Sequence, residues 1–346
     1  MPRKARIDAP LALNHIIARG IERRNIFRDS TDRDNFLDRL ESLLSSTETI
    51  CYAWALMPNH FHLLLRTANT PISDLMKRLL TGYVVTFNRR HKRVGRLFQN
   101  RFKSILCQEE IYFLELIRYI HLNPIRAGQV TSLAALEEYK YCGHGGIMGR
   151  FNIPWQDADS VLSHFGNDAS GARKMYCQFI EKGVDQGRRP DLTGGGVIRS
   201  SGGWTKYASE RKMNKHLKGD ERILGNSNFV DAVLNEQRER MERKYRLQTS
   251  GFDFDALLSH VASLYRLDPE DIVIPGMRGK CAEGRALLCY WCRRELGIKG
   301  TELSKKLGIS PSAVSLLTSR GRKLAIKNRL KLDLELLKAG PRTSII

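Results

Sequence analysis

Strand-like and helix-like patterns alternate along the first part of the chain. Apolar runs rich in β-branched residues predict strands, and apolar residues spaced three or four apart predict helices. These patterns predict a strand over 11–18, a helix after 30–33, strands over 50–56 and 60–66, a helix over 72–91, a strand over 95–108 and a helix over 109–122. The order β-α-β-β-α-β-α predicts an α+β, ferredoxin-like fold, in which an antiparallel sheet carries its helices on one face.

The later parts of the chain have different patterns. Glycine-rich breaks at 194–196 and 200–203 and a charged helix over 229–246 predict an irregular, partly helical linker. After it, Gly308 lies between two helical patterns, with Ser310 as an N-cap and Pro311 at the first helical position. This arrangement is typical of a DNA-binding helix-turn-helix. We therefore predict a first domain over 1–150, a linker over 151–250, an all-α domain over 251–330 and a tail over 331–346.

The charge of the chain points to a polyanionic partner. Its 57 Lys and Arg against 37 Asp and Glu give a formal net charge of +20. Nucleic acid is the first candidate for such an excess and an anionic membrane surface the second, while a role in solubility alone stays open. The sequence shows neither a membrane span nor an apolar signal-peptide core. Seven cysteines without regular spacing suit a reducing compartment, so we expect a cytoplasmic, nucleoid-associated protein.

The strand predicted over 60–66 begins with two histidines. Successive side chains on a strand point to opposite faces, so His60 and His62 share one face while Phe61 and Leu63 point into a core. Two imidazoles held this way make a pair of metal ligands. The alternative is a strand edge that is polar by chance.

A second candidate group lies on the helix predicted over 109–122. Tyr119 and Asn123 are four residues apart, so a helix would place them on one face. The amide oxygen of Asn123 suits a hard ion such as Mg²⁺ or Mn²⁺. Near a metal that polarises a phosphate, the phenol of Tyr119 could act as a nucleophile. The alternative is a core tyrosine, which is the reading we favour for Tyr112.

Five stretches of the chain together resemble one known family. They are PRKAR at 2–6, ARG at 18–20, MPNHFH at 57–62, QNRFKS at 99–104 and YIHLNPIRAG at 119–128. The chain resembles the REP-associated tyrosine transposases, which are IS200-like members of the HUH single-strand DNA endonucleases. Residues 254–324 are similar, more weakly, to the C-terminal helical DNA-binding domain of the replication initiator DnaA, without the signature around its DNA-reading helix.

The resemblance implies a chemistry for these residues. Single-stranded, hairpin-bearing DNA would be cut through a 5′-phosphotyrosine link to Tyr119 and then rejoined. His60, His62 and Asn123 would hold the divalent ion, with Asn123 where single-tyrosine relatives often have glutamine. The candidates for DNA contact are Arg19, Arg23, Arg24, Arg93, Arg101, Lys103, Ser312, Ser315, Arg320 and Arg322.

Two other functions stay open at this point. One is a DNA-binding transcriptional regulator that has lost catalysis, although His60, His62 and Tyr119 are all present. The other is an RNA-binding protein built on a ferredoxin-like sheet, although the strand signature of the RNA-recognition motif is missing. Duplex DNA is a further candidate partner for the all-α domain, and the sequence does not fix the oligomeric state.

Overall fold

The computed structural model of the chain describes residues 6–68, 70–187, 189–192, 220–249, 253–330 and 332. These residues belong to two compact units, Met1–Val233 and Leu234–Ile346, each of which is described here by itself. Most of the 2–6 stretch, the glycine-rich breaks at 194–196 and 200–203, and all of the 331–346 tail except Leu332 lie outside the described residues.

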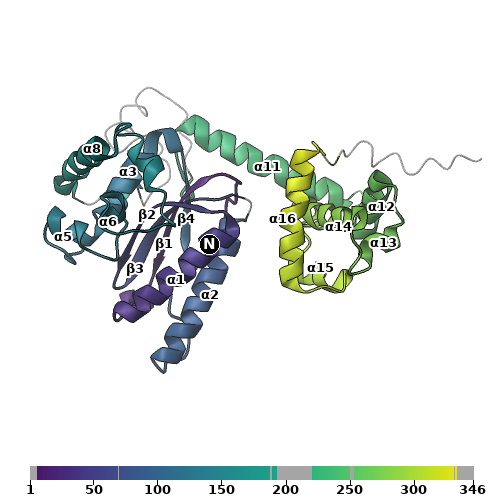
Figure 1. Cartoon of the computed structure of the whole chain (residues 1–346), viewed down its shortest axis with the longest axis horizontal. Helices are drawn as coiled ribbons and strands as arrows, with labels where there is room; N and C mark the ends of the chain where they lie inside the picture. Colours follow the sequence, from purple (N-terminus) through teal and green to yellow (C-terminus); the bar gives the residue numbers. More distant parts are fainter. Residues whose placement is uncertain are drawn as a thin grey trace, which may run out of the picture. The chain divides into compact units, whose positions relative to one another are not determined.

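The first unit is built around one five-stranded sheet (Figure 1). Its strands are β1 (Leu13–Arg19), β2 (Ile50–Met57), β3 (His60–Arg66), β4 (Lys103–Cys107) and β5 (Ile223–Leu224). They lie in the order β2-β3-β1-β4-β5; the first four pair antiparallel, and β5 pairs parallel to β4. The predicted mixed α+β class is confirmed, and β3 begins at His60 as predicted.

Helices cover both faces of this sheet, so the expectation of helices on one face is wrong. Helices α1 (Ser30–Thr47) and α2 (Ile72–Arg90) pack together over one face, on a cluster that includes Phe61 and Leu63. Helices α3 (Glu109–His121) and α8 (Ala169–Glu181) cover the other face, on a cluster that includes Leu64. The physical reason is that alternate residues of the central strands are apolar on both faces, and each apolar face must be buried.

The strand predicted over 95–108 is shorter than expected. Only its second half pairs as β4, because Gly95 has a φ of +93° and turns the chain. The preceding loop still follows the end of β1: the amide of Ile21 donates to the carbonyl of Leu97 at 2.9 Å, and the amide of Gln99 donates to that of Arg19 at 2.9 Å. Leu97 and Phe98, two apolar residues of the range predicted as a strand, instead lie in this loop and pack into the cluster beneath α1 and α2.

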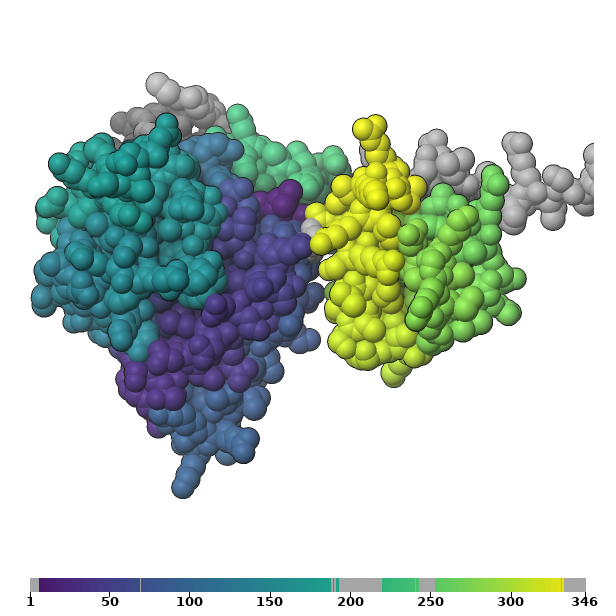
Figure 2. All heavy atoms as spheres, in the orientation of Figure 1, coloured from purple at the N-terminus to yellow at the C-terminus, as the bar shows by residue number. Residues whose placement is uncertain are grey.

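The boundary predicted at residue 150 does not divide the molecule, and the next forty residues do not form a linker. Gln156 is buried, and its side-chain oxygen accepts the indole N–H of Trp54 in β2 at 3.0 Å. The following helices pack into the α3 cluster, and Figure 2 shows the teal surface of this segment continuing into the purple surface of the N-terminal helices. The further helices of this unit are η1 (Ile21–Arg23), α4 (Asn123–Arg126), α5 (Leu133–Glu137), α6 (His144–Ile147), α7 (Ala158–Leu162), η2 (Val184–Gln186) and η3 (Pro190–Leu192).

The second unit is all-helical where it is described. Helix α11 (Ser227–Thr249) runs from the first unit into the second, and the second unit continues with α12 (Phe254–Tyr265), α13 (Pro269–Val273), α14 (Lys280–Trp291), η4 (Cys292–Leu296), α15 (Gly300–Lys306) and α16 (Pro311–Lys327). Gly308 has a φ of +61° at the turn before α16, and the side chain of Ser310 accepts the amide of Ala313 at 3.2 Å. The two helices and the glycine turn therefore lie where the sequence predicts them.

None of the described helices is long and apolar enough to cross a membrane.

Candidate functional site

The two histidines of β3 lie on the α3 side of the sheet. His60 stands opposite Met57 and Arg19, and His62 stands opposite Ala55 and Ile17. Their ring centroids are 5.3 Å apart. His62 is buried and His60 is half-buried. The shared face that the sequence predicts is therefore present in the structure.

Each of these histidines has its Nδ1 atom held by a neighbour. Nδ1 of His60 lies 2.6 Å from the side-chain oxygen of Asn59, which can only accept, so this nitrogen carries the proton. Nδ1 of His62 lies 2.9 Å from Nε2 of His15. Burial, and then the Arg19 guanidinium, lower the pKa of His60 to about 4, and burial lowers the pKa of His62 well below its usual value. Both rings are therefore neutral at pH 7, which is the form that binds a divalent ion.

Tyr119 lies against these histidines. Its ring centroid is 5.6 Å from that of His62 and 5.9 Å from that of His15, in edge-on geometry in both cases. Helix α3 sets this position, because Leu116, Ile117 and Ile120 bury its apolar face on the sheet and leave Tyr119 half-buried at the margin.

Asn123 follows Tyr119 at the start of α4. Its side-chain amide donates to the carbonyl of Tyr119 at 3.0 Å, and the residue is buried. That bond uses the amide nitrogen only, and the side-chain oxygen is the atom that a hard cation would take. Two neutral imidazoles beside a phenol suit a divalent ion with open positions for further ligands and a phosphate.

Several of the predicted DNA-contact residues surround this group. Arg19 is exposed directly opposite His60, and Lys103 is exposed opposite Ile17, in the same cross-strand row as His62. Arg23 and Arg24 are exposed in the adjoining loop, where Asn59 donates to the carbonyl of Arg23 at 3.2 Å. The chain can turn this tightly because residue 20 is a glycine. A Cβ at Gly20 would lie 2.1 Å from the carbonyl oxygen of Arg24.

The other predicted contact residues lie elsewhere. The guanidinium of Arg93 packs over Phe87, 5.9 Å from its ring centre, and Phe87 belongs to the cluster beneath α1 and α2. Arg101 is exposed in the loop before β4. Ser312, Ser315 and Arg320 are exposed on α16, and Arg322 is half-buried there.

Two residues of this site are not among those predicted from the sequence. The first is His15, whose contact with His62 depends on a cross-strand register that no local pattern reveals. The second is Arg126, whose guanidinium lies 5.5 Å from the ring centre of Tyr119 and donates to the carbonyl of Gly183 at 3.1 Å. Arg126 lies within the YIHLNPIRAG stretch at 119–128. Membership of this stretch was the only feature of the sequence that could have pointed to Arg126 as a site residue.

A second group of metal-ligand type, Asp29, Asp32 and His91, lies between α1 and α2. Arg90 already neutralises it, with nitrogens 2.8 Å from Asp29 and 2.6 Å from Asp32. Asp29 also caps α1 by accepting the amide of Asp32 at 3.0 Å. These carboxylates already cap α1 and pair with Arg90, so the face that carries His60 and His62 is better suited to bind a metal ion.

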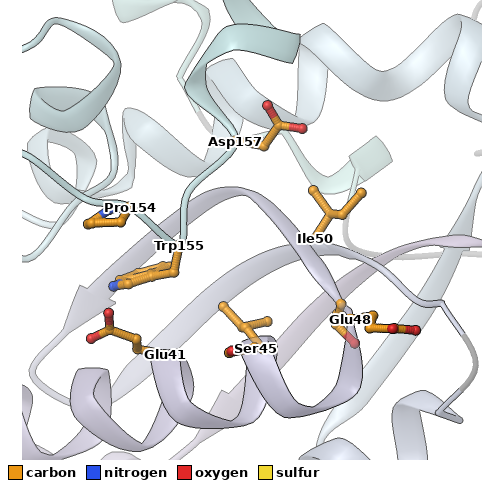
Figure 3. Close-up of a pocket in the computed structure, with 9 residues that line it drawn as sticks. Glu41, Ser45, Glu48, Ile50, Pro154, Trp155 and Asp157 are labelled. Carbon is orange, nitrogen blue, oxygen red and sulfur yellow. The ribbon is translucent and has the colours of Figure 1, made fainter. Parts of the chain in front are cut away.

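A pocket on the α1 side of the first unit does not suit nucleic acid. It lies between α1, the start of β2 and Trp155, and Figure 3 shows the Glu41, Glu48 and Asp157 carboxylates around it. No Lys, Arg or His lines this pocket. Three carboxylates would repel a phosphate.

Behind Tyr119, α3 contributes to a buried polar cluster. The hydroxyl of Tyr176 lies 2.7 Å from Nδ1 of His121 and 3.1 Å from Nδ1 of His144. All three residues are fully buried. Burial lowers the pKa of His144 to about 4 and lowers that of His121 well below its usual value.

This cluster predicts a loss of stability in mild acid. The unfolded chain binds protons at these histidines below about pH 6.5, whereas folded His144 stays neutral until about pH 4. Stability should therefore fall as the pH drops through this window, with His144 alone contributing about 3 kcal/mol. Urea midpoints measured at pH 7.5 and pH 4.5 check this. His144→Gln should reduce the dependence, and the same change at exposed His164 should not; equal slopes in all three proteins would refute the prediction.

Comparison with known proteins gives one family match. Residues 11–123 match the model of the family described as "Transposase IS200 like". No curated protein matches the chain.

Two solved structures show some similarity. A structure described as a REP-associated tyrosine transposase bound to a REP hairpin is 14% identical, covering 45% of this chain and 90% of that one, with a TM-score of 0.37. A candidate transposase from Deinococcus radiodurans R1 is 21% identical, covering 34% of this chain and 95% of that one, with a TM-score of 0.26. The family match runs from the start of the sheet to Asn123 and so includes His60, His62 and Tyr119; this stretch is similar to the IS200-like transposases.

Proposed function

We propose that the chain is a transposase-type endonuclease that cuts and rejoins single-stranded DNA with Tyr119 as the nucleophile and a divalent ion, Mg²⁺ or Mn²⁺. The observation that carries this proposal is the contact between the Tyr119 ring and His62, whose ring in turn neighbours His60. Apolar side chains could fill this margin of the sheet, so a phenol in contact with two imidazoles, those of His62 and His15, suggests a chemical use. The match of residues 11–123 to IS200-like transposases supports the same reaction class.

The proposed step is a transesterification. The Tyr119 oxygen forms a bond to phosphorus, the bond from phosphorus to the 3′-oxygen breaks, and the phenolic proton is balanced by the proton gained at the 3′-hydroxyl. The products are a 5′-phosphotyrosine and a free 3′-hydroxyl, and attack by another 3′-hydroxyl rejoins the strand. The ion, when bound to His60, His62 and Asn123, would offset the charge on the phosphate oxygens.

The positions of the cations support this use of the face. Arg19 on β1 stands opposite His60, and Lys103 on β4 lies in the same cross-strand row as His62, with Ile17 of β1 between them. Both are exposed, so a DNA strand that crosses the sheet from the histidines toward β4 would meet their positive charge. Contacts of this kind bind the phosphates of DNA regardless of its sequence, and they weaken as the salt concentration rises. Hairpin-bearing DNA, which the resemblance suggests, is the substrate to test first.

A labelling experiment tests the proposal. The full chain is incubated with hairpin-bearing single strands labelled at one end or the other, with Mg²⁺, Mn²⁺ or EDTA, and is then denatured. We expect the 3′ label to remain with the protein when metal is present, and mass spectrometry to place the nucleotide on Tyr119. Binding of the same strands without an adduct under any metal condition would instead favour a DNA-binding regulator without catalysis.

We further propose that the second unit binds duplex or hairpin DNA through α16. Ser312, Ser315 and Arg320 are exposed along this helix, and Arg322 is half-buried beside them. A helix that begins after a tight turn and carries small polar residues in its first turns can enter a major groove.

Replacing both Arg320 and Arg322 with alanine should weaken duplex binding by the full chain. Each phosphate contact that is lost should reduce the slope of log K against log salt by about 0.9. A matched control replaces exposed Arg278 and Lys280, just before and at the first residue of α14, with alanine and changes the net charge equally. If both double variants weaken binding to the same degree, the effect comes from net charge and α16 is not the contact.

A further inference from the structure

His15 holds the inner metal-ligand histidine from the neighbouring strand. His15 stands opposite Leu64 on β3, and so it is the diagonal neighbour of His62 on the same face of the sheet. The two rings are stacked, with centroids 5.1 Å apart and planes 26° apart. We propose that His15 is a positioning residue that accepts the Nδ1 proton of His62 and so keeps Nε2 of His62 ready for the divalent ion. This inference rests on the proposed function.

The chemistry of an imidazole ligand requires such a partner. A neutral imidazole has one N–H and one lone pair, so binding an ion at Nε2 requires the proton to be on Nδ1. Metal-bound histidines therefore donate their other N–H to a nearby acceptor, which fixes both the tautomer and the ring orientation. For His60 that acceptor is the side-chain oxygen of Asn59, at 2.6 Å.

His62 meets the same requirement through a different group. Its Nδ1 lies 2.9 Å from Nε2 of His15, and an imidazole lone pair can accept this proton. The two strands fix the geometry, because β1 pairs with β3 on one side and with β4 on the other. His15 is fully buried and cannot swing into water.

The direct cross-strand partners of His15 are apolar. Across the two neighbouring strands its direct partners are Leu64 on β3 and Ile105 on β4. From α3, the ring of Tyr119 meets it edge-on at 5.9 Å. A buried polar ring at the junction of His62 and Tyr119 is costly without a use, since apolar residues fill the equivalent positions around it.

The first test reads the tautomer directly in the unaltered protein. Long-range ¹H–¹⁵N correlation spectra of the full chain, with and without a diamagnetic divalent ion such as Mg²⁺, report which ring nitrogen of His62 carries the proton. We expect the proton on Nδ1. A proton on Nε2 of His62 in both states would overturn the proposal, whether or not the protein cuts DNA.

The second test measures Mn²⁺ affinity from the free-ion EPR signal. His15→Phe keeps a ring but has no acceptor, and we expect it to bind Mn²⁺ about 10- to 100-fold more weakly. His15→Gln places an amide oxygen near the lost nitrogen and should restore most of the affinity. His144→Gln, a change at another buried histidine, is the matched control and should bind Mn²⁺ like the unaltered protein.

The outcomes separate this inference from the proposed function. Mn²⁺ affinity of His15→Phe equal to that of the unaltered protein, in a sample with an unchanged melting temperature, would overturn the role of His15. If His15→Phe does not fold, the tautomer spectrum and His15→Gln still decide. If the unaltered protein binds Mn²⁺ and shows the expected tautomer but forms no adduct with DNA, the endonuclease proposal fails while the role of His15 stands.

Discussion

Replacing Tyr119 with phenylalanine is expected to abolish the covalent link between protein and DNA. The change removes one oxygen and leaves the ring, so the edge-on contacts with His62 and His15 persist. Loss of a nucleophile that no neighbour replaces reduces turnover by at least about a thousandfold. The measurement is the fraction of 3′-labelled strand that remains with denatured protein after incubation with Mn²⁺.

Two controls make this result specific. Tyr112→Phe removes a hydroxyl from the same helix, at a half-buried position two helical turns before Tyr119, and should leave adduct formation unchanged. Non-covalent binding of the strand should be equal in both variants and the unaltered protein, because the phosphate contacts come from arginine and lysine. An adduct formed by Tyr119→Phe at the normal rate would mean that another residue is the nucleophile.

Gly321→Ala is expected to destabilise the second unit by about 3 kcal/mol, against the usual preference of helices for alanine. Gly321 lies inside α16, where an alanine normally adds stability. Here the added Cβ would lie 1.9 Å from the carbonyl oxygen of Ala286 and 2.9 Å from the amide nitrogen of Leu287, both in the backbone of α14. Backbone atoms cannot rotate away, so the two helices would have to separate.

Hydrogen exchange of the full chain measures this effect where it occurs. Amides of α14 and α16 should exchange faster in Gly321→Ala, while those of α1 in the first unit should be unchanged. Ser319→Ala, at an exposed position of the same helix, is the control. In this variant the amides of α16 should exchange as slowly as in the unaltered protein, or more slowly. Unchanged protection in Gly321→Ala would show that α14 and α16 pack less closely than described.

Local periodicity was enough to predict most of the elements of the first unit. The alternation around His60 and His62 predicted both the start of β3 and the face that these histidines share. The spacing of Leu116, Ile117 and Ile120 predicted α3 and the margin on which Tyr119 lies. These features depend on residues that are close together in the sequence.

Features that depend on distant residues were missed. The covering of both sheet faces by helices was not predicted, although β2 is apolar at almost every position and this pattern is typical of a strand buried on both faces. The pairing of Ile223 and Leu224 with β4 and the contact of His15 with His62 require knowledge of which strands are neighbours. β5 has only two residues, too few to show the alternation of apolar and polar positions by which a strand is recognised.

The bond between His121 and Tyr176 has a consequence for how the stretch that matches the transposase family can be inherited. The stretch that matches the transposase family ends at Asn123, yet the helix that carries Tyr119 is braced by a phenol on α8 and, through Arg126, by the carbonyl of Gly183. A gene that moved the matched stretch alone into another protein would carry Tyr119 and the histidines of the proposed site without the residues that hold their helix in place. Recombination that preserves the proposed activity must therefore keep residues up to about the end of α8 together, which sets a larger unit of exchange than the family match suggests.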